Sequence, residues 1–293
     1  MAGRRKAASK EVDLEELVES GASGAYEALQ LFRSRAIRLK SKNDNEAAIS
    51  TLAKGAKSLL KHGYENAGAE LGLLLIEFLN EVGGELTSSQ VDNVLDVEST
   101  YPDSSTHRIE YLKAAIKWSI KAGTVELGDL KLHIALGKVL WTPEQRNAIY
   151  HFAAGEAPIQ LNNLIQTTYK TTDNQVLKER ALTVGILTFL SLDNLRDANE
   201  LLSCYSMHAI DQDNGTYVNE TELEKFNRFL LLTCQRDAQP LFKTLVNTYA
   251  SALDFDDTVP TLLTGPIGLK FFNIQPKSQV NPMMNMLQQM LSK

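Results

Sequence analysis

The chain has 293 residues, of which 43% are hydrophobic and 23% charged, and it carries a net charge of −6. This apolar content is enough for a packed core, and the acidic balance excludes a general nucleic-acid-binding role, which needs a net basic surface. The two cysteines, Cys204 and Cys234, are too few for a disulfide-stapled secreted fold and indicate a reducing compartment.

The N-terminal segment predicts neither a signal peptide nor a membrane anchor. Residues 1–12 begin with a basic run and read as a flexible terminus without the apolar centre of a secretory signal. The longest strongly apolar stretch, residues 71–76, stops at Glu77, well short of the roughly 20 residues that a span needs. We expect a protein of the cytosol with no membrane span.

Helical periodicity runs from Asp13 to about Ala252. Apolar residues recur at steps of three and four, as in Ala25, Leu29 and Phe32, and the same pattern returns in residues 43–62 and 63–82. Several helix boundaries are also predicted. Glycines at 63 and 83–84 fit left-handed helix ends, residues 87–90 and 142–145 fit capping boxes, and serine 104 or 105 can cap the helix that runs through Trp118.

Four helix starts resemble one another, at residues 43–49, 63–69, 143–149 and 192–201. Each has a polar turn, an acidic or amide residue, and then a small residue where two helices meet, as in tetratricopeptide repeats. We therefore predict an all-α fold, a right-handed α-solenoid of helix pairs with an N-terminal half at 13–150 and a C-terminal half at 151–293. Solenoids present extended binding surfaces and serve binding far more often than catalysis.

The pattern changes after Asp254. Two short β-capable runs flank the turn sequence Thr-Gly-Pro, which predicts a β-hairpin at about 256–275, with Pro260 on an edge strand. The tail that follows is rich in methionine, and Met283, Leu287, Met290 and Leu291 share one helical face. This face either docks on neighbouring helices or grips apolar client segments, since methionine suits adaptable apolar grooves.

No catalytic motif stands out in the sequence. Asp129 with His133, and Cys204 with His208, are spaced as helical neighbours that could supply two metal ligands or a thiolate–imidazole pair. Each pair lacks a third group nearby in sequence, so we interpret both as ordinary helix neighbours. The sequence predicts no enzyme, no cofactor and no metal site.

Charge is distributed unevenly. Residues 33–61 hold eight basic and two acidic side chains, within a chain that is acidic as a whole. This asymmetry favours an acidic protein partner at the N-terminal end, and the alternative is a solvated basic face. Tyr26, Gln30 and Arg33 lie on one helical face, and Tyr and Arg are common binding anchors. On charge and spacing, the candidate contacts at this end are Tyr26, Gln30, Arg33, Arg35 and Arg38.

Residues 26–77 resemble the N-terminal half of the Golgi-to-ER-traffic protein 4 family, and further similar segments follow in order at 108–119, 132–141, 148–158 and in the last residues of the chain. The resemblance implies a non-enzymatic α-solenoid adaptor in the post-translational delivery of tail-anchored membrane proteins to the ER. It implies that the N-terminal half docks a targeting ATPase. It also implies that the C-terminal half holds a ubiquitin-like-domain protein, which recruits a co-chaperone. In that case the hairpin residues that contact the partner are Leu262, Leu263, Ile267, Leu269, Phe271 and Phe272.

One departure from the family concerns the C-terminus, where the long acidic tail of animal members is missing, as expected of a fungal-type protein. Three other function classes stay open. One is a chaperone that binds apolar clients directly through the methionine-rich tail. Another is a scaffold subunit of a lid-type complex, which predicts a C-terminal winged helix that this sequence lacks. The last is a hydrolase, which requires one of the two histidine pairs in a deep pocket with a third group.

Overall fold

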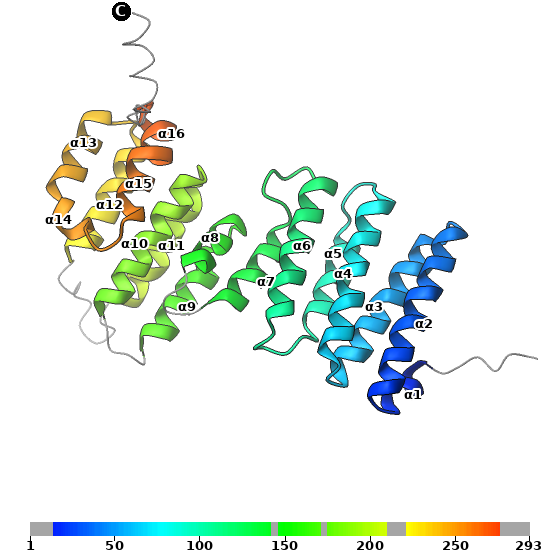
Figure 1. The fold of residues 1–293 in the computed structure, drawn as a ribbon. Coiled ribbons are helices and arrows are strands. Elements are labelled where there is room, and N and C mark those ends of the chain that lie inside the picture. Colours follow the sequence, from blue (N-terminus) through cyan, green and yellow to red (C-terminus); the bar gives the residue numbers. More distant parts are fainter. Residues whose placement is uncertain (1–13, 142–145, 171–174, 210–220, 276–293) are drawn as a thin grey trace, which may run out of the picture. The chain divides into compact units, whose positions relative to one another are not determined.

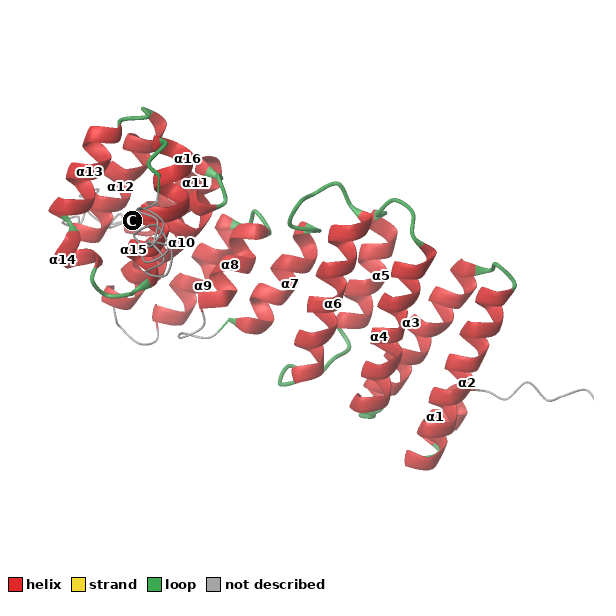
Figure 2. Cartoon of the chain, turned by 45° about the horizontal axis from the view of Figure 1, so that its top comes forward, coloured by secondary structure: helices red, strands yellow, loops and turns green. Residues whose placement is uncertain are grey.

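The computed structural model describes residues 14–141, 146–170, 175–209 and 221–275. Within these ranges the chain is helical, with no β-strand (Figures 1 and 2). The chain divides into two compact units, Met1–Leu140 and Trp141–Lys293, which are described separately below as unit 1 and unit 2.

Unit 1 is a stack of antiparallel helix pairs. Successive helices pack against each other along the chain, apart from α4 and α5, and α2, α4 and α6 also pack in series, as do α3, α5 and α7 (Figure 1). The result is two layers with the apolar core between them. Its helices are α1 (Leu14–Glu19), α2 (Ala22–Ser41), α3 (Asn45–Lys61), α4 (Glu65–Val82), α5 (Ser88–Glu98), α6 (Thr106–Ala122) and α7 (Leu130–Leu140).

The helix ends of unit 1 follow from local chemistry that the sequence predicted. Thr87 and Gln90 form the capping box of α5, and the Ser105 hydroxyl accepts from the Arg108 N–H at the start of α6. Gly63 and Gly83 adopt positive φ angles of 81° and 65° after α3 and α4, a conformation that glycine takes without steric cost. The second predicted capping box, at 142–145, lies outside the described residues.

Close helix contacts in unit 1 depend on glycines. A Cβ atom at Gly55 of α3 would lie 2.6 Å from the Phe32 ring of α2 and 2.7 Å from Leu71 of α4. Gly55→Ala should therefore lower the free energy of unfolding by about 1–3 kcal/mol, the usual cost of overpacking. Gly265→Ala in unit 2, where nothing lies within 4 Å of the new Cβ, should change it by less than about 0.5 kcal/mol. Urea denaturation of both variants tests this, and equal losses would contradict the close contact at Gly55.

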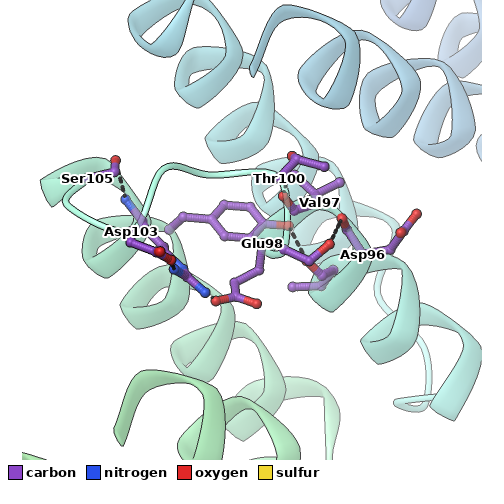
Figure 3. A network of polar contacts seen from close by, with 10 residues as sticks. Asp96, Val97, Glu98, Thr100, Asp103 and Ser105 are labelled. Atoms are coloured by element: carbon purple, nitrogen blue, oxygen red, sulfur yellow. Dashed lines mark hydrogen bonds and ion pairs between the residues drawn. The ribbon is translucent and has the colours of Figure 1, made fainter. Parts of the chain in front are cut away.

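A polar network fastens α5 to α6. Glu98, at the end of α5, accepts a hydrogen bond of 2.7 Å from Arg108 Nε, and Arg108 Nη1 also reaches Asp103 Oδ1 at 3.1 Å (Figure 3). The Tyr111 hydroxyl donates to the Val94 carbonyl oxygen, and the Thr100 hydroxyl donates to that of Val97. The ion pair is largely shielded from solvent, because the side chains of Glu98 and Arg108 are only 9% and 18% exposed.

Unit 2 is built around α10, which is buried on nearly all sides. A helix that is apolar all round belongs in a core, and here α8, α9, α11, α12 and α15 pack against it. The unit contains α8 (Arg146–Ala154), α9 (Pro158–Lys170), α10 (Gln175–Ser191), α11 (Leu195–Ala209), α12 (Glu222–Gln235), α13 (Gln239–Thr248), α14 (Ala250–Leu253), α15 (Thr258–Leu262), the π-helix η1 (Leu263–Ile267) and α16 (Gly268–Phe272).

The prediction of a β-hairpin at 256–275 is wrong, because this segment is the helical run α15–η1–α16 (Figure 2). Asp256 Oδ1 accepts from the Thr258 N–H and hydroxyl where α15 begins, and Pro260 lies in the first turn, where helices tolerate proline. Pro266 would break a regular helix, but it lies inside the π-turn, whose wider hydrogen-bond spacing accommodates it. The predicted all-α fold is confirmed across the described residues, and the right-handed solenoid stays a prediction.

Candidate partner-binding surfaces

The outer face of α2 exposes two large apolar side chains. Tyr26 is 65% exposed and Ile37 is 48% exposed. With about 3.6 residues per turn, Tyr26, Gln30, Arg33 and Ile37 fall within about 60° of one another on the helix. We call these four residues the α2 stripe. The buried residues that hold α2 against α3 and α4 lie on an adjoining side, with Leu29 about 60° and Phe32 about 120° around the helix from Tyr26.

The structure divides the five predicted N-terminal contacts between two sectors of α2. Tyr26, Gln30 and Arg33 belong to the α2 stripe. Arg38 lies about 120° and Arg35 about 180° around the helix from Tyr26. All five are exposed, but one flat surface would reach only the first three. Arg35 and Arg38 instead face away from α4, toward the N-terminal end of the stack, because Arg33 marks the side of α2 that meets α4.

Salt bridges between neighbouring helices of the same layer balance part of the basic N-terminal segment. Arg33 Nη1 lies 3.0 Å from Glu70 Oε1 on α4, and Lys40 pairs with Glu81 on the same helix. Lys57 of α3 pairs with Asp96 of α5. At least three of the eight bases counted in residues 33–61 therefore pair with acidic side chains outside that segment. The positive electrostatic potential around these residues is thus weaker than the count of charges in the sequence implies.

A shallow pocket adjoins Tyr26. Its volume is about 430 Å³, and its walls come from the start of α2 and from the turn between α3 and α4. The small side chains Ala22, Ala25 and Ala67 and the turn at Gly63 make the hollow, with Tyr64 beside it. A pocket next to an exposed tyrosine suits an apolar anchor of a partner protein.

The six predicted C-terminal contacts separate into core and surface residues. Leu263, Ile267 and Phe272 are buried, and the Phe272 ring stacks on Phe242 of α13 at a centroid distance of 4.3 Å. Leu269 is 42% exposed, and Leu262 and Phe271 are partly exposed. Only these last three can present substantial apolar surface to a partner without unpacking unit 2.

A groove lies beside these residues, between α13 and the η1–α16 run. We call it the C-terminal groove, and its volume is about 490 Å³. Sequence analysis missed the contribution of α13, which supplies much of the wall. The helical periodicity of α13 was the available signal, since Phe242 and Val246 are spaced four residues apart. The groove is lined by Phe242, Lys243, Val246, Asn247, Leu263, Thr264, Gly268, Ile274 and Gln275.

The described members of the two histidine pairs have ordinary structural surroundings. Asp129 caps α7 by accepting from the Lys131 and Leu132 N–H groups, and His133 Nε2 lies 2.8 Å from the Leu127 carbonyl oxygen. Burial, and secondly the charge of Glu200, raise the pKa of the Cys204 thiol, which opposes thiolate formation. Burial also raises the pKa of Cys234 to about 12. The side chain of His208 lies outside the described residues, and no cluster of three metal-ligating side chains occurs among those that are described.

His133 makes the stability of unit 1 depend on pH. Burial lowers its pKa, against the opposing effects of the Leu127 carbonyl and Asp129. The unfolded chain therefore binds a proton as the pH falls below about 6.5, before the folded chain does, and the free energy of unfolding falls with it. His133→Gln should flatten this part of the profile. Urea midpoints of both proteins at three pH values between neutral and mildly acidic test this, and parallel profiles would contradict it.

Comparisons with known proteins show the family of the chain. The family model described as Golgi to ER traffic protein 4 matches residues 42–291. This chain belongs to the Golgi to ER traffic protein 4 family. Similar members include Protein GET4 of Arabidopsis thaliana, 28% identical over 93% of this chain and 91% of the relative. Another is the Golgi to ER traffic protein 4 homolog of Homo sapiens, 29% identical over 86% and 76%.

A solved structure of the family shares the fold. The crystal structure of C. therm. Get4 has a TM-score of 0.79, 24% sequence identity, and coverage of 94% of this chain and 93% of that one. No catalytic family is indicated for this Golgi to ER traffic protein 4 member. Across the described ranges, no helix has both the length and the apolar character required to cross a membrane.

Proposed function

We propose that this chain is a cytosolic, non-enzymatic adaptor for the post-translational insertion of tail-anchored proteins into the ER membrane. It would bridge a targeting ATPase, bound by unit 1, and a ubiquitin-like-domain protein, bound by unit 2, which brings the co-chaperone indirectly. One observation carries the proposal. Each unit of this family member has its own exposed apolar surface, the α2 stripe in unit 1 and the α15–α16 face with its groove in unit 2.

The α2 stripe supports the ATPase contact. Tyr26 and Ile37 are large, exposed and anchored on a helix whose other side is packed, so a partner meets a rigid surface. Arg35 and Arg38 lie on the adjoining sector and add positive charge that attracts an acidic protein surface. Arg33 already pairs with Glu70, so it contributes a fixed, partly neutralised site.

The α15–α16 face supports the contact with the ubiquitin-like partner. Leu262, Leu269 and Phe271 are the exposed or partly exposed members of the predicted set, and the C-terminal groove adds an apolar recess beside them. A mostly apolar surface with few charges is the composition of an interface centre. The partner would therefore pack against preformed helices, where the sequence had predicted strand pairing.

Substitutions on this face test the C-terminal assignment. Leu269→Asp with Phe271→Asp should weaken binding of the ubiquitin-like partner by about tenfold or more, because a charge is placed at the centre of an apolar contact. Ile159→Asp, on the exposed side of α9, is the matched control and should leave the affinity unchanged. Isothermal titration of the full chain with the purified partner measures both. Equal affinities for the unsubstituted protein, the double variant and the control would show that the partner does not bind this face.

A further inference from the structure

The C-terminal groove is a preformed recess with rigid walls. The Gln239 side chain donates to the Phe272 carbonyl oxygen at 3.1 Å, which ties α13 to the end of α16. Stacking of the Phe242 ring, which lines the groove, on Phe272 joins the same two helices. Gly268 allows close packing in this wall, since a Cβ there would lie 3.0 Å from the Leu263 carbonyl oxygen and 3.7 Å from Ile274. An apolar recess of about 490 Å³ favours an apolar occupant.

The chain itself leads out of this groove. Ile274 and Gln275 line the groove and are the last described residues, and eighteen more residues follow in the sequence. Between Lys277 and Lys293 the sequence has no charged residue. If residues 283–291 are helical, Met283, Leu287 and Met290 share one face, while Asn285, Gln288 and Gln289 lie on the other. The tail therefore has an apolar side that matches the groove.

We propose that residues 281–293 fill the C-terminal groove of their own chain, through Met283, Leu287 and Met290. Seven residues separate Gln275 from Met283, and they span up to about 25 Å when extended, enough to turn back onto the recess. Methionine adapts its shape to an irregular groove. So short a tether gives an effective concentration on the order of millimolar, which favours this docking over docking between two molecules.

Docking of the tail also has a consequence for partner binding, and this consequence rests on the proposed function. A ubiquitin-like partner that uses the groove must displace residues 281–293. The tail would then cover apolar surface until the partner arrives and would lower the partner's apparent affinity.

Hydrogen exchange in the full-length chain tests the docking. The triple variant Met283→Asp, Leu287→Asp and Met290→Asp should exchange the amides of α13 and η1–α16 about tenfold faster than the unsubstituted protein. The control variant Asn285→Asp, Gln288→Asp and Gln289→Asp adds the same charge on the other face and should match the unsubstituted protein. Exchange should not change between 1 and about 50 µM protein, because the contact is within one chain. Equal exchange in all three proteins, or protection that rises with concentration, would overturn the docking.

Titration with the ubiquitin-like partner separates the two claims. If the tail competes, the triple variant should bind the partner about tenfold more tightly than the control variant. Faster exchange without tighter binding overturns the competition and leaves the docking in place. Failure of every variant to bind the partner overturns the proposed function, whereas the hydrogen-exchange result is unaffected by it.

Discussion

Arg108→Ala should lower the free energy of unfolding of unit 1 by about 3 kcal/mol. The Glu98 carboxylate is 9% exposed, and its ion-pair partner in the described structure is the Arg108 guanidinium, at 2.7 Å. Removing the arginine leaves a charge in a poorly solvated position between α5 and α6. Loss of one partner from a buried pair is costly for this reason, even where the intact pair contributes little.

A matched exposed pair provides the control for this variant. Arg33 and Glu70 lie at a similar distance, 3.0 Å, but their side chains are 46% and 49% exposed. Arg33→Ala should therefore cost less than about 1 kcal/mol. Trp118 is buried in α6 and Trp141 belongs to unit 2, so Trp118 fluorescence in a Trp141→Phe background follows unit 1 during urea denaturation. Equal losses for the two arginine variants would show that burial of the Glu98–Arg108 pair is unimportant.

Tyr26→Ala should weaken binding of the targeting ATPase by about 2 kcal/mol, a factor of about 30. The side chain is 65% exposed in the free chain, so its removal should leave the fold of unit 1 intact and act on the interface alone. Val125→Ala removes another exposed apolar side chain from unit 1 and should leave the affinity unchanged. Titration calorimetry of both variants against the purified ATPase measures the difference. If Tyr26→Ala binds the ATPase within about twofold of the unsubstituted affinity, the α2 stripe is not part of the interface.

The charged sector of α2 should act differently from the tyrosine. Arg35→Glu with Arg38→Glu should weaken ATPase binding most at low salt, because exposed charges are screened as ionic strength rises. Lys54→Glu with Lys61→Glu makes the same change in net charge on α3 and provides the control. If both double variants lose affinity equally, net charge explains the effect and a defined contact at Arg35 and Arg38 is excluded.

Local signals predicted unit 1 well, because its helix ends use standard side-chain chemistry. The capping box at Thr87, the Ser105 cap and the positive φ of Gly63 and Gly83 can all be read from neighbouring residues. The pairing of charges between successive helices of one layer could not be predicted in this way. Arg33, Lys40 and Lys57 meet acids that are 37, 41 and 39 residues further along the chain, a separation set by the stacking of helix pairs.

The β-hairpin prediction failed for a physical reason. Proline, glycine and β-branched residues lower the local helix propensity of residues 256–275, but burial against α10 overrides this preference. The missed signal was periodicity, since Val259, Leu263 and Ile267 are buried at steps of four and Phe272 follows after five. The π-turn spans Leu263–Ile267, just before the longer last step, and it is difficult to predict because it depends on how Pro266 is accommodated.

The central claim is that one chain holds two partners at separate surfaces, and the most direct measurement is the mass of the complex in solution. Sedimentation of the full chain with the ATPase and the ubiquitin-like protein should give one species that contains all three. Tyr26→Ala should remove only the ATPase, and Leu269→Asp with Phe271→Asp should remove only the ubiquitin-like protein. Complexes in which either partner excludes the other, or variants that lose both partners together, would contradict the two-surface adaptor.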